Sequence, residues 1–192
     1  MRNLMLKISR AIFGWPPSPA TTAQKQALVT RIGRETGAKI LVETGTFCGE
    51  MIDAQMENFK KIISIELNAE LHQAARIKYA QTAHVELLQG DSGLKIQEVT
   101  AGLQQAAMFW LDAHYSRGFT SRGAEETPIM KELACIAARK EPGDVILIDD
   151  ARHFGLKSGY PKLKIVREFA TKHWPKHIFS VETDVICIIP SR

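Results

Sequence analysis

The sequence predicts an α/β fold: a doubly wound, mostly parallel sheet that carries helices on both faces and ends in an antiparallel hairpin. Two observations lead to this prediction. From residue 38 onward, short runs that are apolar throughout alternate with segments of helical periodicity, as in parallel strands buried on both faces. The last two runs, 177–183 and 185–190, have little more than Asp184 between them, which leaves no room for a crossover helix.

The chain begins with a segment that ends at a proline-rich break, PPSPATT, at residues 16–22. Before this break, apolar residues recur near helical spacing with basic residues between them: Leu4, Met5, Ile8, Ile12 and Trp15. The helix that they predict has three open roles: packing on the domain or on a second subunit of a homodimer, covering the substrate, or lying on a membrane surface. A second helix follows and ends at Gly37. We therefore expect an N-terminal helical extension at residues 1–37 and an α/β domain at residues 38–192.

The α/β domain is expected to contain five strand–helix units before the hairpin. The strands are predicted at residues 39–43, 61–67, 84–89, 107–112 and 144–149. The helices are predicted after Gly49 and at residues 68–81, 92–105, 128–140 and 160–173. Pro128 opens the fourth of these helices at a favoured position, and Ile129, Leu133 and Ile136 share one face of it.

Composition restricts the class of protein. The three cysteines are odd in number and form no C-x-x-C pair, so neither a disulfide framework nor a zinc site is expected. A net charge of +4 permits an anionic partner, but no dense basic stripe indicates nucleic-acid binding. No apolar run reaches the roughly 18–20 residues that span a bilayer, and basic residues interrupt any signal-peptide core near the N-terminus. These features favour a cytoplasmic protein.

The first predicted strand ends in an unusual turn, ETGTFCG, which contains Glu43, Gly45 and Gly49. Two glycines open the backbone to a ligand at the edge where open α/β sheets bind their ligands. A dinucleotide turn reads G-x-G-x-x-G and binds a pyrophosphate, but here Phe47 stands inside the turn and Glu43 would repel that group. An acid at this position suits a ligand with an ammonium or sulfonium group. The alternative is a tight strand–helix turn with no ligand.

The next two predicted strands also end in acids. Glu66 follows Glu43 by 23 residues and can accept both hydroxyls of a ribose. Asp91 and Ser92 follow the third strand, where an adenine amino group could donate. Each acid alone is more often a solvated loop residue, but three in register with a glycine turn indicate one binding site.

The motifs VETGTFCGEMI, ISIELN and LLQGDSG resemble the first three cofactor motifs of class I S-adenosylmethionine-dependent methyltransferases. The resemblance covers residues 38–189 and includes the closing hairpin. It implies a Rossmann-like, seven-stranded sheet whose last strand is antiparallel, a methyltransferase domain at residues 38–192, and S-adenosyl-L-methionine as the cofactor. The cofactor-binding residues that it implies are Glu43, Gly45, Thr46 and Gly49 at the methionine end, Glu66 at the ribose, Asp91 and Ser92 at the adenine, and Asp112. Most family members have a third glycine where Thr46 or Phe47 stands here.

Polar residues after the fourth and fifth strands are candidates for the chemistry. Methyl transfer to a hydroxyl requires an acceptor held in line with the departing sulfur, and the acceptor must lose a proton. His114 is a candidate general base, with Asp112 and His153 as further catalytic candidates. The alternative for His153 is a packed loop histidine.

A divalent ion is the second way to activate the acceptor. Hard cations prefer oxygen ligands, and Asp112, Asp149 and Asp150 form a candidate Mg²⁺ site. This set resembles that of metal-dependent sugar O-methyltransferases of the macrocin type. The alternative is that Asp149 or Asp150 caps a loop or pairs with Arg152.

These features together predict O-methylation of a small-molecule or carbohydrate hydroxyl. Arg117 and Arg122, in the segment 115–128, either bind an acidic group of the acceptor or are solvated. Three alternatives remain: a methyltransferase acting on nucleic acid or protein, a non-catalytic nucleoside-binding domain, and a dehydrogenase. The Phe47 turn and the terminal hairpin count against the dehydrogenase.

Overall fold

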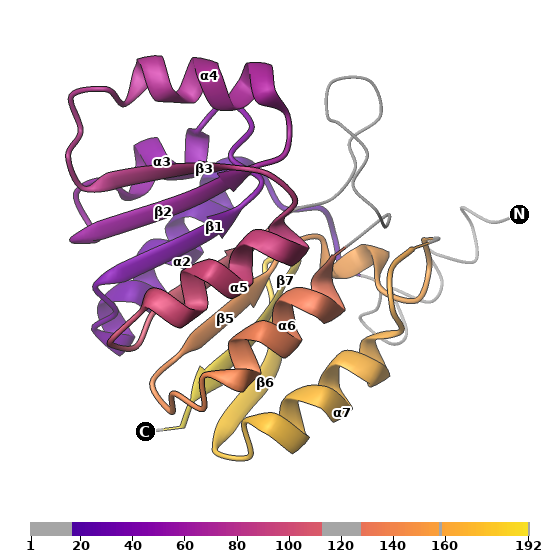
Figure 1. Ribbon diagram of the computed structural model, residues 1–192. Coiled ribbons are helices and arrows are strands. Elements are labelled where there is room, and N and C mark those ends of the chain that lie inside the picture. Colours follow the sequence, from indigo (N-terminus) through magenta and orange to yellow (C-terminus); the bar gives the residue numbers. More distant parts are fainter. Residues whose placement is uncertain (1–16, 113–127, 158, 192) are drawn as a thin grey trace, which may run out of the picture.

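A computed structural model describes residues 17–112, 128–157 and 159–191, which form one seven-stranded sheet with the order β3-β2-β1-β4-β5-β7-β6 (Figure 1). The first five strands run parallel, and β7 lies antiparallel between β5 and β6. The strands are β1 (Ile40–Thr44), β2 (Lys61–Glu66), β3 (Val85–Gln89), β4 (Met108–Leu111), β5 (Val145–Ile148), β6 (His177–Glu182) and β7 (Val185–Pro190). The predicted mostly parallel sheet with an antiparallel last strand is confirmed.

Helices cover both faces of this sheet, as the sequence predicts. They are α2 (Thr22–Thr36), α3 (Glu50–Gln55), α4 (Ala69–Lys78), α5 (Ser92–Gly102), α6 (Ile129–Ala138) and α7 (Leu163–His173), with a 3-10 turn η1 (Ala151–His153). Successive strand residues point to opposite faces, so Val42 joins a core beneath α5, α6 and α7, while Leu41 joins a core beneath α2, α3 and α4. Figure 1 shows α5, α6 and α7 together on the near face.

Helix α2 packs on the sheet as part of the second core. Thr21 and Gln24 form a capping box at its start, and Gly37 ends it with a φ of 72°. Leu28 and Ile32 are buried against the sheet. Residues 22–36, which the sequence places in the extension, therefore share the core of the α/β domain. The helix predicted before Pro16 lies outside the described residues.

The closing hairpin turns through Thr183 and Asp184, whose φ angles are 51° and 61°. Positive φ at both turn residues matches the right-handed twist of the flanking strands. The turn also bonds to the loop after β5, because the Asp184 carbonyl accepts from the Ala151 N–H at 2.8 Å. The hairpin therefore fixes the end of a strand that carries candidate site residues.

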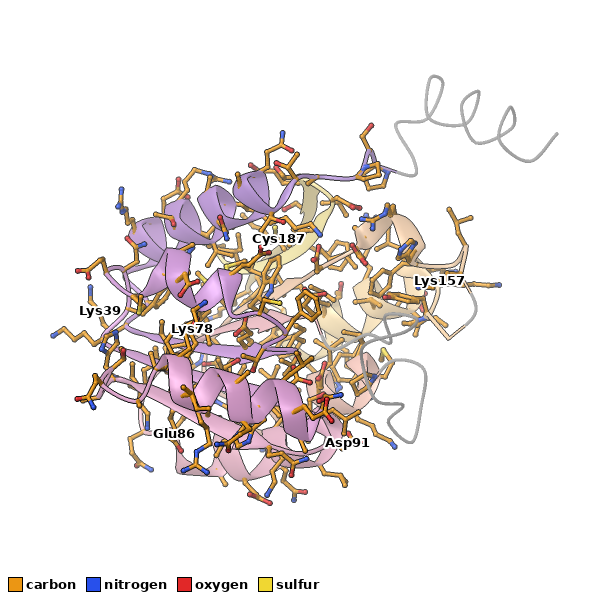
Figure 2. The ribbon with its side chains drawn as sticks, turned by 90° about the horizontal axis from the view of Figure 1, so that it is seen from above. Lys39, Lys78, Glu86, Asp91, Lys157 and Cys187 are labelled. Atoms are coloured by element: carbon orange, nitrogen blue, oxygen red, sulfur yellow. The ribbon has the colours of Figure 1, made fainter. Side chains whose placement is uncertain are left out.

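The strand order reverses between β1 and β4, and the candidate site lies at the carboxyl ends of these strands. In Figure 2, Lys39 marks the opposite, amino end, while Asp91 and Lys157 lie toward the carboxyl ends. In the part of the chain that the structure describes, no helix is long and apolar enough to cross a membrane.

Candidate functional site

The glycine turn after β1 adopts a strained path. Gly45, Phe47 and Gly49 all have positive φ angles, at 87°, 47° and 77°. A Cβ at Gly49 would lie 2.2 Å from the Tyr79 hydroxyl oxygen, which donates to the Gly49 carbonyl at 2.9 Å. Gly49 therefore makes room for Tyr79 of the fold itself, and Gly45, not Gly49, lines the cavity beside the turn.

Glu43 is buried at the end of β1 and lies beside β2. Its Oε2 accepts a hydrogen bond from the Ser64 hydroxyl at 2.5 Å, and the Ser64 and Thr46 hydroxyl oxygens are 2.6 Å apart. Burial raises the pKa of Glu43 to about 8, and the carboxylates of Asp112 and Glu66 add to the rise while Ser64 opposes it. A carboxyl group with this pKa is largely protonated at neutral pH.

Glu66 shapes the glycine turn from the end of β2. Its two carboxylate oxygens accept from the Phe47 N–H at 2.9 Å and the Asn68 N–H at 2.8 Å. Only 4% of its surface is exposed. Each carboxylate oxygen has a second lone pair, so the pair of oxygens retains the capacity to accept from ribose hydroxyls. Within the described residues, no ion pair reaches Glu66 or Glu43.

Asp91 caps helix α5 after β3. Its Oδ1 accepts from the Gly93 N–H at 2.8 Å, as expected of an N-cap aspartate. Ser92, the first residue of the helix, is buried. The start of α5, with Asp91 as its N-cap and Ser92 as its first residue, lies beside β2. The sequence predicts that an adenine binds here.

Glu132 is a buried acid that the sequence analysis did not single out. It lies on α6 with no exposed surface, and the Ser92 and Thr44 hydroxyls are polar neighbours without full hydrogen-bond geometry to either carboxyl oxygen. Burial raises its pKa to about 7. The sequence does contain a signal that Glu132 is buried, because the residue falls between Ile129 and Ile136 on the apolar face of the helix.

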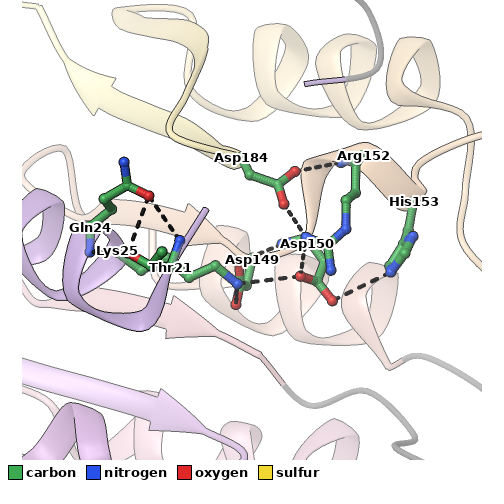
Figure 3. A network of polar contacts seen from close by, with 8 residues as sticks. All are labelled: Thr21, Gln24, Lys25, Asp149, Asp150, Arg152, His153 and Asp184. Atoms are coloured by element: carbon green, nitrogen blue, oxygen red, sulfur yellow. Dashed lines mark hydrogen bonds and ion pairs between the residues drawn. The ribbon is translucent and has the colours of Figure 1, made fainter. Parts of the chain in front are cut away.

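The end of β5 carries two buried aspartates that already have cationic partners (Figure 3). The Lys25 Nζ of α2 lies 2.6 Å from Asp149 Oδ2 and 3.3 Å from Asp150 Oδ1. Arg152 Nη1 lies 2.7 Å from the same Asp150 oxygen and also pairs with Asp184. The pairing of Asp150 with Arg152, which the sequence analysis left open, is therefore present.

The residues of the predicted Mg²⁺ site do not fit a divalent ion in this arrangement. Asp149 Oδ1 accepts from the Asp150 N–H at 2.6 Å while Oδ2 contacts Lys25. Across the described ranges, no group of three or more His, Cys, Asp or Glu side chains is placed to hold a metal ion. Asp112 lies nearby, with its N–H donating to the Thr44 carbonyl at 3.1 Å. A lysine ammonium therefore contacts two of the three predicted metal ligands, Asp149 and Asp150.

The two histidine candidates have different outcomes. His153 Nε2 is 3.7 Å from Asp150 Oδ2, and its ring makes an edge contact with Tyr160. These contacts are those expected of a packed loop histidine, and the catalytic role of His153 stays a prediction. His114, like Arg117 and Arg122, lies outside the described residues, so its role as a base stays a prediction.

A cavity of about 120 Å³ lies between α2, the glycine turn and the ends of β4 and β5. Its wall includes Lys25, Glu43, Gly45, Thr46, Asp112 and Asp149. This volume is below the roughly 300–1,000 Å³ of a complete small-molecule site. Of the other predicted residues, Gly49, Glu66, Asp91, Ser92, Asp150 and His153 do not line this cavity.

A larger hollow of about 680 Å³ lies between α5 and α6 and is lined by Arg139. It is near the amino ends of the strands, where α/β sheets do not bind ligands.

Solved structures of low sequence identity share the fold of this chain. No protein-family model matches the chain, and no curated protein matches it by sequence. The fold is similar to the O-methyltransferase TomG of Streptomyces achromogenes in complex with SAM, at 18% identity and a TM-score of 0.62, covering 96% of this chain and 88% of that one. It is also similar to the SAH-bound Podospora anserina methyltransferase PaMTH1, at 15% identity and a TM-score of 0.62, covering 99% and 87%. A candidate rRNA methylase from Clostridium thermocellum has 12% identity and a TM-score of 0.63, covering 91% and 99%.

The chain therefore has the Rossmann-like fold of class I S-adenosylmethionine-dependent methyltransferases. TomG is described as an O-methyltransferase involved in tomaymycin synthesis and the Clostridium protein as a candidate rRNA methylase, so the shared fold does not select among acceptors.

Proposed function

We propose that this protein is an S-adenosylmethionine-dependent methyltransferase that methylates a hydroxyl of a small molecule or carbohydrate. One observation carries the proposal. Glu43 and Glu66 are buried at adjacent strand ends, at the switch point of the sheet, and accept hydrogen bonds from neutral donors. Buried acids without a cation of their own favour a ligand that brings positive charge. S-adenosylmethionine carries a sulfonium and an ammonium.

The proposed pose follows the strand ends in order. The methionine end enters the cavity at Gly45 and Thr46, beside Glu43. The ribose hydroxyls donate to Glu66, which is fixed by its two backbone N–H groups. The adenine lies at Asp91 and Ser92, where α5 begins. We call the ends of β1, β2 and β3 the cofactor half of the site.

The ends of β4 and β5 form the acceptor half, around Asp112, Asp149 and Asp150. In the reaction, the acceptor oxygen forms a bond to the methyl carbon as the carbon–sulfur bond breaks, and the electron pair of that bond goes to sulfur. The hydroxyl proton passes to a base, for which His114 and Asp112 are the candidates. Holding the two reactants in line supplies much of the rate, because effective molarities of well-oriented reactions are about 10⁵ M or more.

Calorimetry tests the cofactor assignment directly. We expect S-adenosylmethionine and S-adenosylhomocysteine to bind with micromolar dissociation constants and NAD not to bind. Binding of NAD in preference to both would contradict the proposal. Binding of both without methyl transfer to any hydroxyl in a screen of sugars, phenols and RNA would favour the non-catalytic alternative, and transfer to RNA alone would replace the small-molecule acceptor.

A further inference from the structure

The acceptor half contains a built-in cation. Lys25 extends from α2 to the end of β5, 124 residues later in the chain, and contacts Asp149 and Asp150 (Figure 3). Its side chain is 15% exposed and lines the same cavity as Glu43 and Asp112. The lysine is therefore placed where the methyl group and the acceptor meet in the proposed pose.

We propose that the Lys25 ammonium takes the place of a divalent metal ion in this site and positions the acceptor oxygen. In this inference, the identity of the acceptor rests on the proposed function. The contact of Lys25 with Asp149 and Asp150 is a property of the free protein. With Lys25 in this role, methyl transfer is independent of added metal.

The charges around Lys25 support a permanent cation. A half-buried ammonium is retained only where acids compensate its lost hydration. Here Asp149 and Asp150 supply this compensation, because their carboxyl oxygens lie 2.6 Å and 3.3 Å from the Lys25 Nζ.

The hydrogen-bonding capacity of Lys25 leaves one donor for the acceptor. An ammonium has three N–H bonds. Asp149 and Asp150 take two of them, at 2.6 Å and 3.3 Å. The third is available to an oxygen in the cavity, and a fixed positive charge there stabilises the negative charge that develops as a hydroxyl loses its proton. This is a positioning role for the acceptor oxygen.

A metal ion would have to displace Lys25 from these carboxylates. Mg²⁺ requires about six oxygen ligands in near-octahedral geometry. The Asp149 oxygens are used by Lys25 and the Asp150 N–H, and the nearer Asp150 oxygen is shared by Lys25 and Arg152. Removal of the lysine side chain would free an Asp149 oxygen and leave the cluster with excess negative charge, which a divalent ion could neutralise.

The test measures Mn²⁺ binding by electron paramagnetic resonance and S-adenosylhomocysteine binding by calorimetry on the same samples. We expect the wild-type protein not to bind Mn²⁺ below millimolar concentration, and Lys25→Ala to bind it at least tenfold more tightly. Adding Asp149→Asn to Lys25→Ala should abolish the gained binding. The matched control is Lys61→Ala, which removes a lysine paired with Glu86 at 2.9 Å outside the site and should gain nothing.

Two results would overturn the inference: micromolar Mn²⁺ binding by the wild-type protein, or no gain of Mn²⁺ binding in a folded Lys25→Ala or Lys25→Met protein. Retained S-adenosylhomocysteine binding in these variants shows that the cofactor half is intact, so either result would leave the proposed function standing. Failure of the wild-type protein to bind S-adenosylhomocysteine would instead contradict the proposed function.

Discussion

The cofactor half and the acceptor half both bury carboxylates at strand ends, but they compensate them differently. Glu43 and Glu66 accept from a hydroxyl and from backbone N–H groups. Asp149 and Asp150 are compensated by Lys25 and Arg152, which come from α2 and from η1. Under the proposed function, the first half suits a ligand that brings its own positive charge, and the second would supply positive charge to an acceptor that becomes negative.

The largest expected effect is on the stability of the acceptor half. Asp184→Ala removes a fully buried carboxylate that accepts from the Arg152 N–H at 2.8 Å and pairs with its guanidinium. The change leaves the Arg152 N–H without its acceptor and the guanidinium with Asp150 alone, so we expect a loss of about 3 kcal/mol in the free energy of unfolding, measured by urea denaturation. Cofactor affinity should not change once the variant is folded.

Asp184→Asn is the control for this variant. Asparagine tolerates the positive φ of 61° and keeps an oxygen for the Arg152 N–H, so the loss should be smaller. A parallel fall in cofactor affinity in either variant would show that the halves are not independent.

The next effect is on binding in the cofactor half. Glu66→Ala removes the acceptor of the Phe47 and Asn68 N–H groups and of the proposed ribose hydroxyls. Hydrogen bonds to charged groups contribute about 1.5–3 kcal/mol each, so we expect S-adenosylhomocysteine affinity to fall about 100-fold by calorimetry. Glu86→Ala, on the exposed side of β3, should leave it unchanged. Equal affinity in the Glu66 variant would refute the assigned ribose position.

A smaller effect concerns the pH dependence of stability. The folded-state pKa of Glu132 is raised by burial to about 7, above its ordinary value, so the folded protein retains a proton that the unfolded chain loses. Stability from this group is therefore lost as pH rises from about 4.5 to 7. Glu132→Gln keeps the shape without ionising, and we expect it to raise the unfolding free energy at pH 8 by about 1–3 kcal/mol, with little change at pH 4.5. A thermal-denaturation series that shows equal shifts at both pH values would contradict the assignment.

The sequence predicts the fold and the positions of the strand-end acids better than the contacts around Lys25. The strands and the hairpin follow from local apolar patterns, and Glu43, Glu66 and Asp91 follow strand ends that any parallel sheet brings to one edge. Lys25 has no such signal, because it is an ordinary first-turn residue of an amphipathic helix. Its contact with Asp149 depends on how α2 packs on the sheet.

Gly49 and Ser64 also have contacts that the sequence alone does not predict. Gly49 was predicted to admit a ligand, whereas its Cβ position is taken by Tyr79, which is 30 residues distant in the chain. Ser64 donates to Glu43 only because the register of β1 and β2 sets the two residues opposite each other. Register and helix packing are properties of the folded chain that no short motif contains.

The measurement that tests this account most directly is the number of protons released when S-adenosylmethionine binds. At pH 6.5, Glu43 with its pKa of about 8 is protonated in the free protein, and the α-amino group of the ligand, whose ordinary pKa is about 7.7–8.0, is already charged. A cation beside Glu43 favours its carboxylate, so titrations in buffers of different ionisation enthalpy should show release approaching one proton in the wild type and almost none in Glu43→Gln. Binding without proton release in the wild type, or equal release in both proteins, would contradict the claim that Glu43 is protonated in the free protein and ionises when the cationic ligand binds.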